Sequence, residues 1–285
     1  MIKIIKYFFE SLAIYLFFFI IKLLGLSVSR ILFSFIFKKI GPLIRSRDTL
    51  KKNLNIFSNK ISDQKKKEIE LNMWSNYGKT FVEYMFLKKF RKENLHIKIE
   101  GKEILDEVNH SNKPVIFISG HFANFELMSM EITKNKINLA TIYRPLNNFF
   151  LNPLMEYLRK KYVCNKQIKK GRSGIKECIE YIEKGYSVAL MIDQRLGEGD
   201  RVKFFSKTAH TTSLPAQLSL KYHLNVIPIF IEREHKDSFK MKIYEPIDTS
   251  NFKNKAEITL KLNEVLENMI MKNPNQWIWT HDRWK

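Results

Sequence analysis

The apolar residues of this chain follow a different pattern in each of its parts. In residues 1–44 they are almost continuous: the ten-residue run Leu12–Ile21 is uncharged, and Lys22 separates it from a second apolar stretch. This run is shorter than the roughly 20 residues of a membrane-spanning helix, and no small-residue cleavage site follows it. We therefore expect two apolar helices hinged near residues 25–27, forming an interfacial or shallowly inserted membrane anchor. A spanning anchor and a helix buried in a soluble core are the alternatives.

The next part of the chain has a helical pattern. Residues 46–59 predict a short basic connector helix. Between Ile69 and Leu87, apolar residues recur at the spacing of an amphipathic helix. Ser62 or Asp63 is suited to cap its start. Its apolar stripe is typical of core packing.

From about residue 95, short apolar strands alternate with helices. The expected strands are 96–100, 113–120, 138–144, 186–193, 226–233 and 239–246. The expected helices are ELMSMEITK, 147–161, 175–185, 214–223 and 255–272. This alternation predicts an α/β fold with a mixed, mostly parallel sheet flanked by helices, and a site at the carboxyl ends of the strands. We expect residues 1–45 to be the anchor and residues 46–285 to be one domain.

Charge and cysteine content restrict the class of protein. Lys and Arg number 49 against 29 Asp and Glu, a formal net charge of +20. This charge favours acidic partners: nucleic acid, an anionic membrane or an acidic carrier protein. An AT-rich genome would also encode many lysines. The two cysteines, Cys164 and Cys178, exclude a disulfide-rich scaffold and a multi-cysteine zinc site.

The strand expected at 113–120 leads into a motif with candidate chemistry, GHFANFE. His121 follows the strand directly, Asn124 is a suitable helix N-cap, and Glu126 then falls in the first helical turn. If the histidine folds back over that turn, Glu126 accepts a hydrogen bond from one ring nitrogen and leaves the other free as a base. The chain has no metalloprotease histidine pair, no serine-hydrolase elbow and no P-loop. A histidine satisfied by a backbone carbonyl is the structural alternative.

Two further charged residues end expected strands. Arg144 in TIYRP is suited to bind a phosphate or carboxylate, since its guanidinium presents a fork of donors. Asp193 follows the apolar strand SVALMI. It is expected to hold an arginine such as Arg144, to orient an acceptor, or only to cap a loop. Because strand ends share one edge of a parallel sheet, both are expected to converge with His121 on one cleft.

The sequence resembles the bacterial lipid A late acyltransferases of the lysophospholipid acyltransferase superfamily, whose mark is His-x4-Asp/Glu. The matching blocks run in the family's order and cover most of residues 70–285: ISGHFANFELM, YRPLNNFFLNPLMEYLRKKY, SVALMIDQR, KFFSKTAHTTSLPAQLSLKYHLNVIPIF and QWIWTHDRWK. The resemblance implies that His121 is the general base on an acceptor hydroxyl and that Glu126 orients it. It also favours a site role for Asp193, Asn124 and a basic residue at Arg159 or Lys160.

The same resemblance implies the reaction and its partners. A hydroxyl attacks an acyl thioester, normally on acyl carrier protein, with no metal, no cofactor and no covalent enzyme intermediate. Backbone N–H groups from Ala123 to Phe125 are expected to stabilise the oxyanion.

The leading hypothesis is therefore an inner-membrane O-acyltransferase of lipid A precursors or related glycolipids. Its catalytic domain is expected on the cytoplasmic face, where acyl carrier protein is found. A lysophospholipid or an amino-acid lipid is the alternative acceptor. A basic membrane-binding or nucleic-acid-binding protein is the non-enzymatic alternative, but the chain shows no nucleic-acid recognition module.

Overall fold

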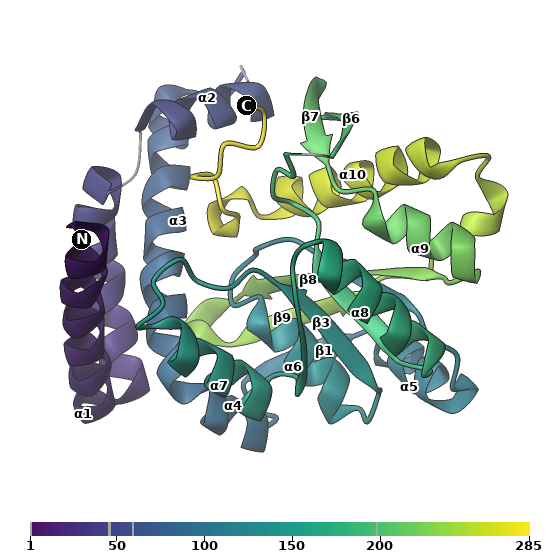
Figure 1. The fold of residues 1–285 in the computed structure, drawn as a ribbon. Helices are drawn as coiled ribbons and strands as arrows, with labels where there is room; N and C mark the ends of the chain where they lie inside the picture. The colour runs from purple at the N-terminus through teal and green to yellow at the C-terminus, as the bar shows by residue number, and fades with distance from the viewer. Residues whose placement is uncertain (1, 45–46, 59, 198) are drawn as a thin grey trace.

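The N-terminal apolar segment folds into a helical hairpin in the computed structural model, which describes residues 2–44, 47–58, 60–197 and 199–285. Helix α1 (Ile2–Ile44) turns back at Gly25, whose backbone has φ 76° and ψ 173°. This conformation suits glycine, which lacks a Cβ. The two arms lie side by side along α3 (Figure 1), and the rings of Phe17 and Phe33 meet edge to face at 5.7 Å. The expected hinge is confirmed.

Most of the hairpin's apolar side chains face outward. The exposed ones include Phe8, Phe9, Leu12, Leu16, Phe19, Leu23, Val28, Ile31 and Phe35. Helix Ile2–Leu43 is long and apolar enough to cross a membrane, and only 17% of its most apolar window is buried. A helix in a soluble core would be mostly buried. The exposure of these side chains therefore contradicts the soluble-core alternative.

Helix α3 (Asp63–Glu83) joins the hairpin to the rest of the molecule. Ser62 caps it as expected, accepting a hydrogen bond from the Lys65 N–H. Helix α2 (Arg47–Phe57) matches the expected connector, and Asn53 donates to two carbonyls of the C-terminal segment. Residues 46 and 59 of the expected connector, and the expected boundary between 45 and 46, lie outside the described residues.

The main sheet has the strand order β1-β9-β8-β2-β5-β3-β4. Its strands are β1 (Ile97–Glu100), β2 (Ile116–Ser119), β3 (Leu139–Tyr143), β4 (Lys166–Lys169), β5 (Ser187–Met191), β8 (Val226–Arg233) and β9 (Phe239–Ile243). Adjacent strands pair in parallel except β8 and β9, which are antiparallel. The prediction of a mixed, mostly parallel sheet is confirmed.

Helices cover both faces of this sheet. They are α4 (Leu87–Lys92), α5 (Lys102–Ser111), α6 (Glu126–Lys134), α7 (Asn152–Tyr162), α8 (Arg172–Glu183), α9 (Leu214–Tyr222) and α10 (Lys255–Lys272). In β2, Ile116 and Ile118 pack into one apolar cluster with α8, α9 and α10, while Phe117 packs into another with α5 and α6. This alternation follows from the two-residue period of a strand.

Some elements were not expected from the sequence. They are α5, β4 and an antiparallel hairpin of β6 (Asp200–Phe204) and β7 (Lys207–Thr211). These strands mix charged and apolar residues, so they lack the continuous apolar run of a strand buried on both faces.

We expect the contact between α3 and the hairpin to tolerate no added atom at Gly78. A Cβ built there would lie 2.2 Å from the Phe33 carbonyl oxygen, so Gly78→Ala should force the hairpin away and cost about 1–3 kcal/mol. Thermal unfolding in detergent should show a midpoint lowered by several degrees. Gly197→Ala is the matched control, because a Cβ at Gly197 meets nothing within 4 Å. Equal midpoints for the two variants would contradict this packing.

Candidate active site

His121 and Asp193 meet at the carboxyl edge of the sheet. Strands β2 and β5 pair with Ser119 opposite Met191, which brings the residues after them together. The His121 N–H donates to Asp193 Oδ2 at 2.8 Å, and the ring Nδ1 lies 2.7 Å from Asp193 Oδ1. Trp277 Nε1 also donates to Oδ2, at 2.9 Å. Asp193 therefore holds both the backbone and the ring of His121, as its position at a strand end permits.

The electrostatics of this pair favour an imidazole that carries its proton on Nδ1. Burial raises the pKa of the Asp193 carboxyl, but the charge and hydrogen bonds of His121 and the Trp277 N–H outweigh it, so this pKa lies below its ordinary value. An ionised carboxylate on Nδ1 keeps a proton on that nitrogen. The His121 side chain is 20% exposed, and its Nε2 has no hydrogen-bond partner within the described ranges. Nε2 is thus available as an acceptor.

Contrary to expectation, Glu126 does not contact this imidazole. Its Oε1 accepts hydrogen bonds from Tyr84 Oη and from Arg159 Nε, both at 2.7 Å. Helix α6 begins at Glu126 itself, and the Phe125 ring packs edge-on against His121 at 4.7 Å. The carboxylate therefore points toward α7, and Asp193 takes the place on His121 that the sequence assigned to Glu126.

The Glu126 cluster is a buried ion pair with a tyrosine. Burial lowers the pKa of Arg159, but the charge of Glu126 and the hydrogen bonds to Glu126 and Tyr84 raise it by more, so this guanidinium stays charged. Burial and the Glu126 charge both raise the pKa of Tyr84, so its hydroxyl stays protonated and donates. Arg159 thus lies at the site, held by a protein carboxylate.

Asn124 is not the helix N-cap that the sequence predicted. Residue 125 occupies that position, without a capping side chain. Asn124 is 1% exposed, and its Nδ2 donates to Glu83 Oε2 at 2.9 Å. Its side chain therefore helps to fix the turn after β2 against α3.

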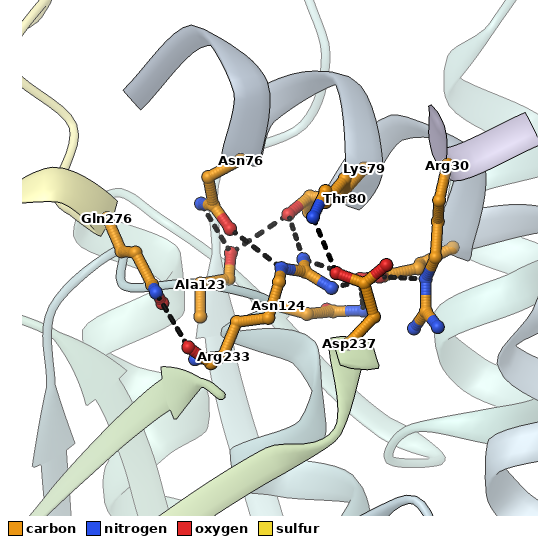
Figure 2. A network of polar contacts seen from close by, with 10 residues as sticks. Arg30, Asn76, Lys79, Thr80, Ala123, Asn124, Arg233, Asp237 and Gln276 are labelled. Carbon is orange, nitrogen blue, oxygen red and sulfur yellow. Dashed lines mark hydrogen bonds and ion pairs between the residues drawn. The ribbon is translucent and has the colours of Figure 1, made fainter. Parts of the chain in front are cut away.

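The turn between His121 and Glu126 has an unusual backbone. Ala123 has φ 43°, a left-handed conformation that residues with a Cβ seldom adopt. Its carbonyl accepts from Thr80 Oγ1 at 3.0 Å and from Asn76 Nδ2 (Figure 2). Its N–H donates to the Gln276 carbonyl. The N–H of Ala123 is therefore occupied, which removes it from the expected oxyanion donors.

Arg144 follows β3 at the same edge and is exposed. Asp193 does not form an ion pair with it, since His121 and Trp277 bind the Asp193 oxygens. Lys170, which the sequence did not single out, follows β4 beside Arg144. The charge of Arg144 lowers its pKa and that of Asp193 raises it. The signal for Lys170 was weak, because β4 itself was not recognised.

The C-terminal segment contributes Trp277 to the site and buries Arg283. Trp277 reaches the site, while Arg283 is fully buried and donates to Thr211 Oγ1 at 2.7 Å and to the His210 carbonyl. Burial lowers the pKa of Arg283 to about 10. The residues that the structure describes contain no group of three or more His, Cys, Asp or Glu side chains suited to a metal ion.

The two carboxylates should have separable effects on the imidazole. In Asp193→Asn, His121 should lose its fixed Nδ1–H tautomer, while in Glu126→Gln it should keep it, because only Asp193 contacts the ring. The nitrogen chemical shifts of ¹⁵N-labelled histidine, assigned with His121→Ala, report the tautomer. Loss of the tautomer in Glu126→Gln alone would reverse the assignment.

Comparison with known proteins points to one family. The family model described as bacterial lipid A biosynthesis acyltransferase matches residues 2–285. Lipid A biosynthesis acyltransferase 2 of Shigella flexneri is 24% identical over 245 residues, which cover 82% of this chain and 76% of that protein. The lipid A biosynthesis lauroyltransferase of Escherichia coli K12 is 23% identical over 242 residues, covering 82% and 77% of the two chains.

A solved structure also resembles this one. It is the 1-acyl-sn-glycerophosphate acyltransferase of Thermotoga maritima, with a TM-score of 0.43 and 16% identity, covering 87% of this chain and 98% of that one. The match of the family model from residue 2 to residue 285 is the decisive finding. The chain is an acyltransferase and belongs to the bacterial lipid A biosynthesis acyltransferase family.

Proposed function

We propose that this acyltransferase moves a fatty acyl group from the thioester of acyl carrier protein to a hydroxyl of a lipid A precursor or related glycolipid. It acts at the inner membrane, with its catalytic domain on the cytoplasmic face. The observation that carries the proposal is the His121–Asp193 pair, because it leaves one imidazole nitrogen unpartnered at the carboxyl edge of the sheet. A lysophospholipid or amino-acid lipid is a second class of acceptor for the same chemistry.

His121 acts as the general base in this reaction. Its Nε2 takes the proton of the acceptor hydroxyl as the oxygen attacks the thioester carbonyl, giving a tetrahedral oxyanion. The intermediate collapses to the ester and breaks the carbon–sulfur bond. The thiolate leaves and recovers the proton from the imidazolium. Asp193 stabilises the imidazolium formed between these steps, since the two groups are 2.7 Å apart.

Glu126 supports the reaction through Arg159 and Tyr84 rather than through the imidazole. All three are largely buried beside the turn that carries His121. We assign Glu126 a positioning role: it fixes the start of α6 and orients Arg159 toward the substrate. Asn124 positions the same turn through Glu83. The N–H groups of Asn124 and Phe125 are the remaining oxyanion donors, because Ala123 donates to Gln276.

The N-terminal hairpin supplies the membrane contact. Its outward apolar surface and its lysines, including Lys3, Lys6, Lys38 and Lys39, suit insertion at an anionic leaflet. A net charge of +20 also suits an acidic carrier protein. The donor thioester is found in the cytosol, so the active site must face it there.

Loss of the proposed base should abolish most of the activity. His121→Ala should lower the rate of acyl transfer by about 10²–10⁴-fold, the usual effect of removing a general base. Mass spectrometry of the glycolipid product, following a mass step of one acyl group, measures it. His110→Ala, on the exposed end of α5, is the control and should change the rate less than twofold. Near-normal turnover in His121→Ala would exclude the mechanism.

The membrane contact should depend on the outward face of the hairpin. Phe9 and Phe19 are each 62% exposed. Replacing both with Glu should release the protein from membranes during a carbonate wash, because a charged side chain is costly to place in the hydrocarbon of a bilayer. Leu95→Glu is the control, because Leu95 is 99% exposed but precedes β1, outside the hairpin. Retention of the double variant would place the anchor elsewhere. Digestion of the catalytic domain by protease outside spheroplasts would disprove the cytoplasmic orientation.

A further inference from the structure

Two cations lie side by side at the carboxyl edge of the sheet. Strands β3 and β4 pair with Tyr143 opposite Lys169, so Arg144 and Lys170 follow them together. The Lys170 N–H donates to the Tyr143 carbonyl at 2.8 Å, which fixes this register to its end. Both side chains are exposed, and neither forms an ion pair with a carboxylate of the part of the chain that the structure describes.

Among the described residues, no carboxylate forms an ion pair with either cation to offset their repulsion. The Lys170 side chain is exposed, but the protein around it removes part of the water from its ammonium; this partial desolvation and the charge of Arg144 both lower its pKa. Asp193 attracts Lys170, but its oxygens already accept from His121 and Trp277. Neighbouring Lys169, by contrast, pairs with Glu156 at 3.5 Å. Two like charges side by side without a counter-ion destabilise a fold. Such unfavourable arrangements are found mainly at functional sites, where a ligand can supply the opposite charge.

We propose that Arg144 and Lys170 together bind a phosphate group of a substrate beside the His121–Asp193 pair. This inference rests on the proposed function and names a subsite of it. The arginine fork contacts two phosphate oxygens, and the lysine ammonium contacts a third as a point charge.

Two substrates carry the required chemistry. An acidic glycolipid acceptor presents a phosphate monoester, which carries about −1.5 to −2 charges at neutral pH. The pantetheine arm of a carrier protein presents a phosphodiester with a single charge. Two adjacent cations match the monoester better, so the acceptor is the favoured source.

Lysine labelling tests binding without requiring acyl transfer. Trace acetic anhydride is added to the full-length protein in detergent, with inorganic phosphate or with chloride at equal ionic strength, and modified lysines are quantified by mass spectrometry. Phosphate should slow the labelling of Lys170 several-fold but not that of Lys166, at the opposite end of the same strand. In Arg144→Gln, this protection should disappear. Unchanged labelling of Lys170 in the wild type would overturn the phosphate site, even if acyl transfer is observed.

Kinetics identify the source of the phosphate. Lys170→Gln should raise the KM for a phosphorylated glycolipid acceptor about tenfold, the effect of losing one charged hydrogen bond. The KM for the same acceptor after dephosphorylation should be unchanged. Lys166→Gln, which makes the same charge change on the same strand, should alter neither. A rise only in the KM for acyl carrier protein thioester would support the site with the donor as its source. Equal KM values for all substrates in Lys170→Gln and wild type would refute it.

Discussion

The buried carboxylate of Glu83 is the interaction on which the arrangement of this molecule depends. It is fully buried, and it binds Arg30 of the hairpin at 2.8 Å, both terminal nitrogens of Arg233 at the end of β8, and Asn124 of the active-site turn. A charge in such a place is expensive unless it is fully paired, and removing one partner of a buried pair typically costs about 3–5 kcal/mol. Because its partners come from three separate parts of the chain, Glu83 can be satisfied only when the hairpin, α3 and the sheet are all in place.

The same network of hydrogen bonds holds the left-handed turn after His121 in place. Arg233, in addition to Glu83, binds Asn76 and Thr80, and these two side chains hold the Ala123 carbonyl (Figure 2). The side-chain amide of Gln276 accepts from the backbone N–H of Arg233 and donates to its carbonyl. The backbone carbonyl of Gln276 accepts from the Ala123 N–H. A strained backbone persists where surrounding contacts determine it. The residues that hold the hairpin therefore also hold the turn that carries His121. This network fixes the position of the hairpin's apolar surface relative to the imidazole.

The sequence predicted the features that depend on neighbouring residues and failed on those that depend on distant ones. The hinge at Gly25, the buried strands and the position of His121 after β2 follow from local composition and periodicity. The partner of His121 does not, because Asp193 lies 72 residues away and only the pairing of β2 with β5 brings it near. The helix N-cap is Phe125, one residue later than expected, and the Glu126 carboxylate binds Tyr84 and Arg159 instead of the imidazole. Trp277 lies 84 residues from Asp193, so no local pattern could reveal its hydrogen bond to that carboxylate. Strand β4 escaped notice because its lysines interrupt the apolar pattern, and with it the position of Lys170 was lost.

The charges around the imidazole explain why the site carries cations as well as a base. An ionised Asp193 holds the proton on Nδ1 of His121 and leaves Nε2 as an acceptor, but the same negative charge repels an anion that approaches it. Arg144 and Lys170 lie on the neighbouring strand ends, where Asp193 attracts the charge of Lys170 while His121 remains its hydrogen-bond partner. Arg159 attracts an anion less strongly than these two cations, since its charge is already neutralised by Glu126. In the proposed reaction, the edge of the sheet therefore separates two tasks that would conflict on one side chain: Asp193 orients the imidazole, and the exposed cations Arg144 and Lys170 attract a negatively charged substrate.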